Sequence, residues 1–234
     1  MKVFAHRGAS GEHPENTLLA MEQAIQQQAH GIEFDVQQAR DGFIITHDRL
    51  ITCSQQNQTR VAPRTVEELQ KLDLAQQQTP PTLKQVMQCI GGRCQANVEL
   101  KDVSELQWIK EELTHAIEQL GFQAEQIIVS SFNHHLLTEV NTWELGVEIG
   151  ALTASLPIDY AAFATEIGAH AVHADINALN EAFVRDAKAR GLQVRVYTVD
   201  EQHDIEQLFH WNVDAIFSNY PSRAIKIIEQ LKQK

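Results

Sequence analysis

The chain has 234 residues, and its 31 acidic against 19 basic side chains give a formal net charge of −12, which excludes simple electrostatic binding to nucleic acid or to an anionic membrane. This length suits one large domain or two small ones, and a chain of this size needs no disulfides to stabilise its core. No apolar run approaches the roughly 20 residues that a membrane-spanning helix requires.

The cysteines and the start of the chain both favour the cytoplasm. Cys53, Cys89 and Cys94 are odd in number and lack the spacing of a metal site, so we interpret them as reduced thiols. The first candidate site residue, His6, lies too close to the start to leave room for a signal peptide. We therefore expect a cytoplasmic protein without stable membrane association.

The first 50 residues predict short strands around one helix. A strand over 2–5 leads into a His-Arg-Gly turn, and apolar residues at helical spacing predict a helix over 18–25. Residues 32–36 alternate with period two. Asp41-Gly42 is a strong hairpin signal that joins this strand to an extra partner strand over 43–46.

The next 40 residues are more polar. Residues 50–63 show no pattern and predict a loop. Residues 64–73 predict a short helix with Thr65 as its N-cap. Pro80-Pro81-Thr82 opens another helix to about residue 90, and Gly91-Gly92 ends it.

From residue 96 onward, strands and helices alternate regularly. We expect strands over 96–100, 127–132, 148–153, 171–175, 192–199 and 215–218, and helices over 104–120, from 133, 158–167, 180–190, 202–210 and 221–231. Together with the first two strands this makes eight βα units, which predicts an α/β protein with a TIM (β/α)₈ barrel and a short extra β-hairpin segment after strand 2. An open doubly wound sheet is the alternative. Without a long linker, we expect residues 1–234 to form a single domain.

Polar side chains gather at the ends of the first predicted strands. In a parallel barrel, the chemistry lies at the carboxyl ends of the strands. Applied to this chain, that rule brings together His6, Arg7, Glu33, Asp35, His47, Glu99 and Lys101.

These residue types suit metal-assisted phosphoryl chemistry. Three carboxylates at one barrel mouth would repel one another unless a cation lies between them, and oxygen ligands favour Mg²⁺ or Ca²⁺ over zinc. Arg7 and Lys101 can bind phosphate oxygens. His6 and His47 can divide the proton transfers between them, one as base on the attacking hydroxyl or water and the other as acid to the leaving alkoxide.

Structural interpretations compete with this site. A lone histidine after an apolar run is more often structural than catalytic, and Glu99 with Lys101 is a simple ion pair when taken alone. Paired carboxylates on one buried strand face are rare, however, and favour a site. His173 and Asp175 share a strand face that can reach the mouth, but we favour a structural role for both.

Several other polar and aromatic residues are not assigned to the predicted site. His134 and His135 are expected to begin a surface helix, and Ser130 has no evident base beside it. The three tryptophans lie in predicted helices and are interpreted as packing residues.

The chain resembles the glycerophosphodiester phosphodiesterase family over nearly its whole length. The resemblance rests on His6-Arg7-Gly8, Pro14-Glu15-Asn16-Thr17, Glu33-x-Asp35, Asp41-Gly42, His47-Asp48, Pro81-Thr82-Leu83, Glu99-Leu100-Lys101, Ser130-Ser131-Phe132, Tyr197-Thr198-Val199 and Val213-Asp214-Ala215-Ile216. It implies a TIM-barrel enzyme that hydrolyses glycerophosphodiesters to sn-glycerol 3-phosphate and an alcohol with a divalent cation.

The resemblance also implies a role for each matching residue. By this carry-over, His6 and His47 match the acid/base histidines. The metal ligands are matched by Glu33, Asp35 and Glu99, and the phosphate contacts by Arg7 and Lys101.

Some positions depart from the family pattern. Tyr197 stands where the family often has Trp, at a position thought to line the organic part of the substrate. Ser218-Asn219 replaces the usual Thr-Asp, and Ile51-Thr52-Cys53 replaces a Thr-Thr pair. The segment 49–63, where family members carry an insertion over the site, is short here, so we expect an open site.

The leading functional hypothesis is a metal-dependent phosphodiesterase that acts on small-molecule glycerophosphodiesters such as deacylated phospholipids. Attack by the glycerol 2-hydroxyl to give a cyclic phosphate and direct attack by water are both compatible with it. One alternative is a lysophospholipase D that accepts an acyl chain, which would require an apolar groove beside the mouth. Another is a non-catalytic barrel that binds phosphoesters. No nucleic-acid partner is expected, and no oligomeric state is predicted.

Overall fold

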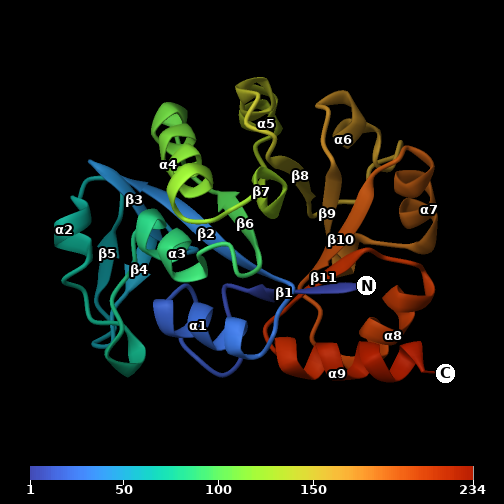
Figure 1. Cartoon of the computed structure of the whole chain (residues 1–234), viewed down its shortest axis with the longest axis horizontal. Coiled ribbons are helices and arrows are strands. Elements are labelled where there is room, and N and C mark those ends of the chain that lie inside the picture. The colour runs from blue at the N-terminus through green and yellow to red at the C-terminus, as the bar shows by residue number, and fades with distance from the viewer. Residues whose placement is uncertain (234) are drawn as a thin grey trace.

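The computed structural model describes residues 1–233, and a closed cylinder of eight parallel strands lies at its centre (Figure 1). The strands are β1 (Lys2–His6), β2 (Gly31–Ala39), β6 (Gln95–Leu100), β7 (Ile127–Ser131), β8 (Glu148–Thr153), β9 (Ala171–Asp175), β10 (Gln193–Tyr197) and β11 (Ala215–Ser218). The cylinder closes because β1 pairs with both β2 and β11. The predicted (β/α)₈ barrel is confirmed, and the alternative of an open sheet is wrong.

Helices follow in the order of the chain, and all but the second, which packs against the extra strand after strand 2, surround this cylinder. They are α1 (Leu18–Gln26), α2 (Val66–Leu69), α3 (Leu83–Ile90), α4 (Leu106–Gln119), α5 (His134–Val140), α6 (Ala162–Glu166), α7 (Glu181–Ala189), α8 (Gln202–His210) and α9 (Pro221–Lys232). Single 3₁₀ turns lie at Ala75–Gln77, Ala124–Gln126, Asn141–Trp143 and Ile176–Ala178. Three of the helices begin at threonine caps: the Thr17 hydroxyl accepts from the Ala20 N–H, and Thr65 and Thr82, where helix starts were expected, each form a capping box.

The predicted extra strand after strand 2 is also confirmed. β2 continues beyond the cylinder, and its last four residues pair antiparallel with β3 (Gly42–Ile45). The Thr46 N–H then donates to the Asp35 carbonyl over 3.0 Å. This pairing returns the chain to the mouth of the barrel, where His47 follows.

The prediction of a loop over residues 50–63 is wrong. Short strands β4 (Leu50–Thr52) and β5 (Gln58–Arg60) pair antiparallel within it. Ile51 and Val61 are buried in a small apolar cluster beneath them. These two buried residues lie ten positions apart in a mostly polar stretch and give no periodic signal, which is why the sequence did not reveal the hairpin.

Three other elements are shorter than predicted. The helix expected over 64–73 is reduced to the four residues of α2, and the strand expected over 192–199 ends at Tyr197. The helix expected over 158–167 begins only at Ala162, because Tyr160 adopts a left-handed backbone conformation (φ 51°). Helical propensity does not anticipate a turn of this kind.

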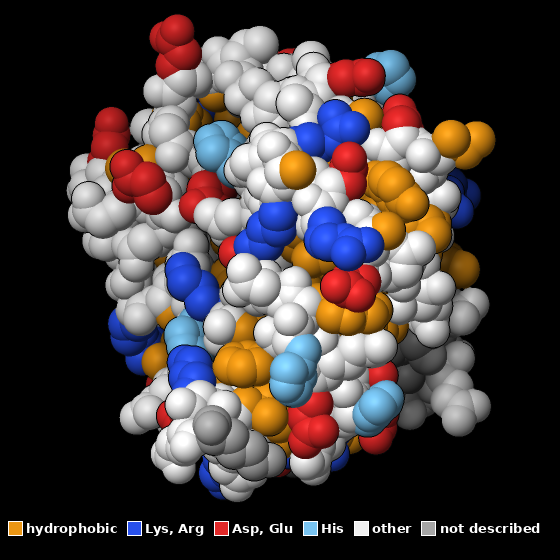
Figure 2. All heavy atoms as spheres, turned by 90° about the vertical axis from the view of Figure 1, so that its right-hand side faces the viewer, with side chains coloured by type: hydrophobic (Ala, Val, Ile, Leu, Met, Phe, Trp, Pro, Cys, Tyr) orange, Lys and Arg blue, Asp and Glu red, His pale blue; other side chains and the backbone are white. Residues whose placement is uncertain are grey.

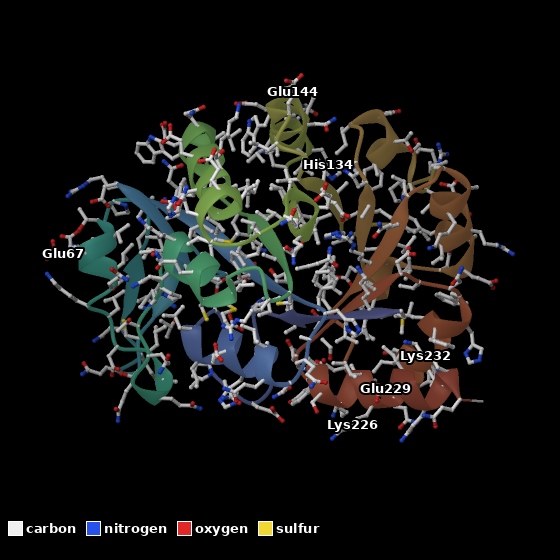
Figure 3. The ribbon with its side chains drawn as sticks, viewed as in Figure 1. Glu67, His134, Glu144, Lys226, Glu229 and Lys232 are labelled. Atoms are coloured by element: carbon white, nitrogen blue, oxygen red, sulfur yellow. The ribbon has the colours of Figure 1, made fainter. Side chains whose placement is uncertain are left out.

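Most of the apolar core lies between the strands and the helices. The inner faces of the helices are buried, as with Ala224 and Ile228 of α9, while Lys226, Glu229 and Lys232 lie along its outer side (Figure 3). The face that carries α7 and α8 mixes acidic, basic and histidine side chains with separate hydrophobic areas (Figure 2). None of the helices formed by residues 1–233 has the length and apolarity to cross a membrane.

Candidate active site

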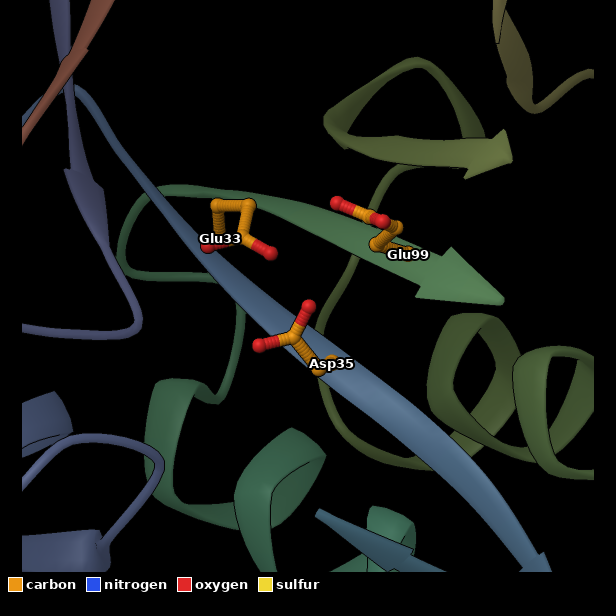
Figure 4. Close-up of side chains that lie close together, drawn as sticks. All are labelled: Glu33, Asp35 and Glu99. Carbon is orange, nitrogen blue, oxygen red and sulfur yellow. The ribbon is translucent and has the colours of Figure 1, made fainter. Parts of the chain in front are cut away.

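Three carboxylates converge at the carboxyl end of the barrel. Glu33 and Asp35 come from β2 and Glu99 from β6, and strand register places Asp35 directly beside Glu99. One oxygen from each lies within 4.8 Å of the others (Figure 4). All three residues are buried, with exposed fractions of 2%, 1% and 8%. Buried carboxylates at this separation need positive charge among them.

The pKa values reflect this crowding. Burial, followed by the charges of Asp35 and Glu99, raises the pKa of Glu33 well above its ordinary value. Burial and Asp35 also raise the pKa of Glu99. Burial alone would raise the pKa of Asp35 as well, but Lys101 and Arg7 outweigh it and lower that pKa. Asp35 is therefore the carboxylate whose charge the protein itself balances.

Two cationic side chains flank Asp35. The Arg7 Nε atom lies 3.3 Å from Asp35 Oδ2, and Lys101 Nζ lies 3.1 Å from Asp35 Oδ1. Lys101 also forms an ion pair with Glu99, and Arg7 Nη1 pairs with Glu15 over 3.0 Å. Three carboxylates thus face two cations at the centre of the site. This leaves a net negative charge that suits an additional cation.

The loop after β1 fixes the positions of these groups. Arg7 has a left-handed backbone (φ 58°), and its N–H donates to Glu33 Oε2 over 2.9 Å. Gly8 follows with φ +81°, where a side chain would come within 2.7 Å of Ala20. The Asn16 amide donates to Asp35 Oδ2 over 2.8 Å. The His-Arg-Gly sequence therefore turns tightly enough to aim a backbone N–H at Glu33 and a guanidinium at Asp35.

His6 is oriented by a hydrogen-bonded chain from the last two barrel strands. The Asn219 Nδ2 atom donates to Asp200 Oδ2 over 2.7 Å, which turns Asn219 Oδ1 toward His6. The His6 Nδ1–H donates to this oxygen over 2.8 Å, so Nε2 is left for the site. Burial and then Arg7 lower the pKa of His6 below its ordinary value. The lowered pKa favours a neutral imidazole, and the Asn219 amide fixes its tautomer.

His47 has a different environment. It follows β3, its side chain is 37% exposed, and its Nδ1 lies 2.8 Å from Asp48 Oδ1. Its backbone carbonyl accepts from the Gln37 side chain over 2.9 Å. His47, Lys101 and Phe132 line one cavity of about 620 Å³ at the mouth, so His47 faces solvent and a ligand-sized space together.

Tyr197 ends β10 beside this mouth. Its hydroxyl donates to the Thr153 carbonyl over 2.9 Å, and its ring meets that of Phe132 edge-on at 6.2 Å. Phe132 itself is exposed, and Lys101 Nζ lies 5.8 Å from its ring centre. An aromatic surface therefore borders the cationic part of the site.

The structure brings together all seven residues that the strand-end rule collected, with Tyr197 close by. It also adds Asn16, Asp200 and Asn219, whose roles sequence reasoning missed. Asp200 lies three residues after the end of β10, and Asn219 directly follows β11. The same strand-end rule would have found both, had it been applied to the last strands as well as to the first.

The residues left outside the predicted site take other positions. The His134 Nε2–H donates to the Leu152 carbonyl over 2.9 Å, and His134 stacks on Phe163 at the start of α5 (Figure 3). Asp175 accepts from the Asn177 N–H over 2.8 Å in the turn after β9. His173 is fully buried inside the barrel, where burial and Arg195 lower its pKa well below the ordinary value.

Comparison with known proteins gives consistent matches over the whole chain. The model of the glycerophosphoryl diester phosphodiesterase family matches residues 6–223. A glycerophosphodiester phosphodiesterase of Caldanaerobacter subterraneus is 31% identical over 238 residues, which cover 97% of this chain and 98% of that protein. One from Bacillus altitudinis is 31% identical over 244 residues, which cover 99% of each.

Solved structures agree in fold. An Oleispira antarctica phosphodiesterase, solved in complex with the product sn-glycerol-3-phosphate, superposes with a TM-score of 0.85 at 26% identity and covers 98% of this chain and 97% of its own. A glycerophosphodiester phosphodiesterase from Parabacteroides distasonis superposes with a TM-score of 0.84 at 24% identity, covering 99% and 98%. Both are similar along nearly their whole length.

Proposed function

Because the chain belongs to the glycerophosphoryl diester phosphodiesterase family, we propose that it hydrolyses glycerophosphodiesters to sn-glycerol 3-phosphate and an alcohol, with a divalent cation and two histidines. Family membership makes the chain a phosphodiesterase. The observation that carries the finer proposal is the convergence of two histidines, two cationic side chains and three buried carboxylates at one barrel mouth. The product bound in the similar Oleispira antarctica enzyme supports the same product here.

The three carboxylates fit a hard divalent cation. Glu33, Asp35 and Glu99 offer only oxygen ligands, which Mg²⁺ and Ca²⁺ prefer. Burial and the neighbouring carboxylates raise the pKa values of Glu33 and Glu99, and a bound cation would counter both effects, which supports this proposal. When bound, such a cation polarises a phosphoryl oxygen and offsets the charge that develops on it.

The protein's own cations would hold the phosphate. Arg7 and Lys101 both remain charged, because burial alone would lower their pKa values but the neighbouring carboxylates raise them. A guanidinium presents paired donors to phosphate oxygens and an ammonium presents a compact charge. We assign both to phosphate binding. Tyr197, on the aromatic border of the mouth, would line the organic part of the substrate.

The environments of the two histidines suggest how they divide the proton transfers. His6 is partly buried with Nε2 available, and its lowered pKa favours the neutral imidazole, so we assign it as the base that takes a proton from the attacking hydroxyl or water. His47 is partly exposed, so it can regain a proton from solvent after each turnover. We assign it as the acid that protonates the leaving alkoxide. Both the cyclic-phosphate route and direct water attack fit this division.

A coupled assay for glycerol 3-phosphate tests the function. We expect purified protein to release it from at least one of a panel of glycerophosphodiesters, to stop in EDTA and to recover with Mg²⁺ or Ca²⁺. The variants His6→Ala and His47→Ala should lose turnover by about 100-fold or more. His135→Ala, on the exposed side of α5, is the matched control and should keep full activity.

The same panel decides between the alternatives. Cleavage of lysophosphatidylcholine in preference to glycerophosphocholine would establish a lysophospholipase D. Tight binding of glycerophosphodiesters without any glycerol 3-phosphate would establish a binding protein. Full activity in either His→Ala variant would refute the assignment of the two histidines.

We also propose that residues 1–234 act as one domain in the cytoplasm. The single closed barrel, which uses strands from both ends of the chain, supports the first point. The free thiols of Cys53, Cys89 and Cys94 suit a reducing compartment and support the second.

A further inference from the structure

The interior of the barrel holds a histidine that the proposed reaction does not use. His173 of β9 is fully buried, and its ring lies 5.2 Å from that of Phe217. Gly150 of the neighbouring β8 makes room for it, because a Cβ there would lie 2.5 Å from the His173 ring. The strands therefore provide a specific space for an imidazole inside the barrel.

Hydrogen-bond chemistry fixes the tautomer of His173. Its Nε2 lies 3.5 Å from the Arg195 Nη1 atom, and Arg195 is held in turn by an ion pair with Glu148. A guanidinium can only donate, so Nε2 must present its lone pair and Nδ1 must carry the proton. The Nδ1–H is a buried donor, and it has no acceptor among residues 1–233.

Two buried acceptors without a partner in the described part of the chain lie on the same small cavity. The cavity has a volume of about 20 Å³, and Glu33, Asn97 and His173 are among its lining residues. Asn97 Nδ2 donates to Ser130 Oγ over 3.0 Å, which leaves Asn97 Oδ1 unpaired. Glu33 Oε2 accepts from the Arg7 N–H, which leaves Glu33 Oε1 unpaired.

These groups match the hydrogen-bonding capacity of water. A cavity of this size holds one water molecule, and buried waters typically make about three hydrogen bonds. A water accepts from one donor and donates to two acceptors, and the cavity offers His173 Nδ1–H as donor with Asn97 Oδ1 and Glu33 Oε1 as acceptors. Neither acceptor can pair with the other directly, whereas water satisfies all three.

We propose that this cavity binds a single water between His173 and Asn97, and that His173 acts through it as a positioning residue for the Glu33 carboxylate. The second half of the proposal rests on the proposed function, in which Glu33 binds the cation. Groups that orient a metal ligand in this way typically change metal affinity by about 10–100-fold. A purely structural role is the rival, in which His173 only fills space and faces Arg195.

Two amide variants separate these roles. The amide of His173→Asn lies near the former Nδ1 and can still donate to the water, but it does not reach Arg195. The longer His173→Gln places its amide near the former Nε2 and keeps the contact with Arg195 instead. Both variants remove ring volume from the same space, so thermal unfolding should show similar losses of stability and serves as the control for packing.

The first measurement is a high-resolution crystal structure of the wild-type protein. We expect one ordered water within about 3.2 Å of both His173 Nδ1 and Asn97 Oδ1. A cavity without density would overturn the proposal. Because this result depends on neither catalysis nor a bound cation, it stands even if the proposed function fails or a variant does not fold.

The second measurement is the Kd for Mg²⁺ and for Ca²⁺, by calorimetry on the purified full chain. We expect His173→Asn to stay within about 3-fold of wild type and His173→Gln to weaken binding about 10-fold or more. Equal affinities in the two variants, or the reverse order, would refute the positioning role. If the wild-type protein binds neither ion, the proposed function is contradicted and the positioning role of His173 is refuted with it. The water site is still decided by the crystal structure.

Discussion

Replacing Glu33 with Gln should make the cation-free protein more stable while abolishing activity. Two unit charges 4.8 Å apart, the largest separation among the three carboxylate oxygens, repel by about 3.5 kcal/mol at an effective dielectric of about 20. Glu33 has two such neighbours, but Arg7 and Lys101 offset part of this repulsion. A neutral amide can still accept from the Arg7 N–H and can donate to a neighbouring carboxylate. We therefore expect a net gain of about 2 kcal/mol.

The gain should depend on pH in a defined direction. The pKa of Glu33 is raised in the folded protein, so the folded state keeps a proton that the unfolded chain releases. Stability that is present below the ordinary glutamate pKa of about 4.3 is then lost as pH rises toward the folded-state value. Glu33→Gln does not have this loss, so its stability advantage over wild type should be larger at pH 8 than at pH 5.

Thermal and chemical unfolding in EDTA at both pH values measure this effect. For a chain of this length, 2 kcal/mol corresponds to a rise in Tm of about 4–8 °C. Excess Mg²⁺ or Ca²⁺ should stabilise the wild type, by about 2.7 kcal/mol at 100 times Kd, and should stabilise the variant much less. Glu118→Gln, on the exposed side of α4, is the matched control and should change neither value.

Two outcomes would refute this reasoning. One is a Glu33→Gln protein that is less stable than wild type in EDTA at pH 8. The other is a variant that the cation stabilises as strongly as it stabilises wild type. The first result would mean that the three carboxylates do not repel one another strongly without a cation. The second would mean that Glu33 does not contribute to binding the cation.

Four further predictions follow from the site and the barrel interior. Asn219→Leu removes the acceptor of the His6 Nδ1–H, so kcat should fall about 10-fold or more with little change in KM, and an unchanged kcat would contradict that role. Because burial and Arg7 lower the pKa of His6, the acidic limb of kcat/KM in wild type should fall below about pH 6.5; a limb well above that value would exclude His6 as the base. Lys101→Met should reduce kcat/KM about 100-fold, and activity near wild type would remove it from phosphate binding. Gly150→Ala should lower stability by about 1–3 kcal/mol in chemical unfolding because its Cβ would meet His173, and wild-type stability would show that the ring can move aside.

The barrel could be predicted from sequence because its strands and helices are periodic. Each buried parallel strand is a short apolar run, and each helix carries a cap or a glycine stop, so local signals and the global fold agree. The β4–β5 hairpin could not be predicted, since Ile51 is the only buried residue within it and Val61, the next buried residue, lies ten positions further on. Its strands are specified by contacts with α2 and β3 and not by a local pattern.

The position of His173 shows a different limit of sequence reasoning. Period-two alternation predicts that His173 and Asp175 lie on the same side of β9. Alternation gives the face of the strand on which a side chain lies but not its depth within the barrel. Residues two positions apart are separated by about 6.6 Å along the strand. Asp175, at the strand end, reaches the turn above the barrel, whereas His173 lies below the mouth among the interior side chains.

The two histidines of the site illustrate why residue type alone does not assign a role. In sequence, His6 and His47 are equivalent, since each follows an apolar strand and precedes a charged residue. In the structure, His6 is partly buried and held by a neutral amide, with Arg7 beside it, while the side chain of His47 is 37% exposed and paired with the Asp48 carboxylate. Groups whose environments differ in this way take different parts in proton transfer. The neutral partner matters most, because Asn219 fixes the His6 tautomer without adding the negative charge that would favour a proton on Nε2.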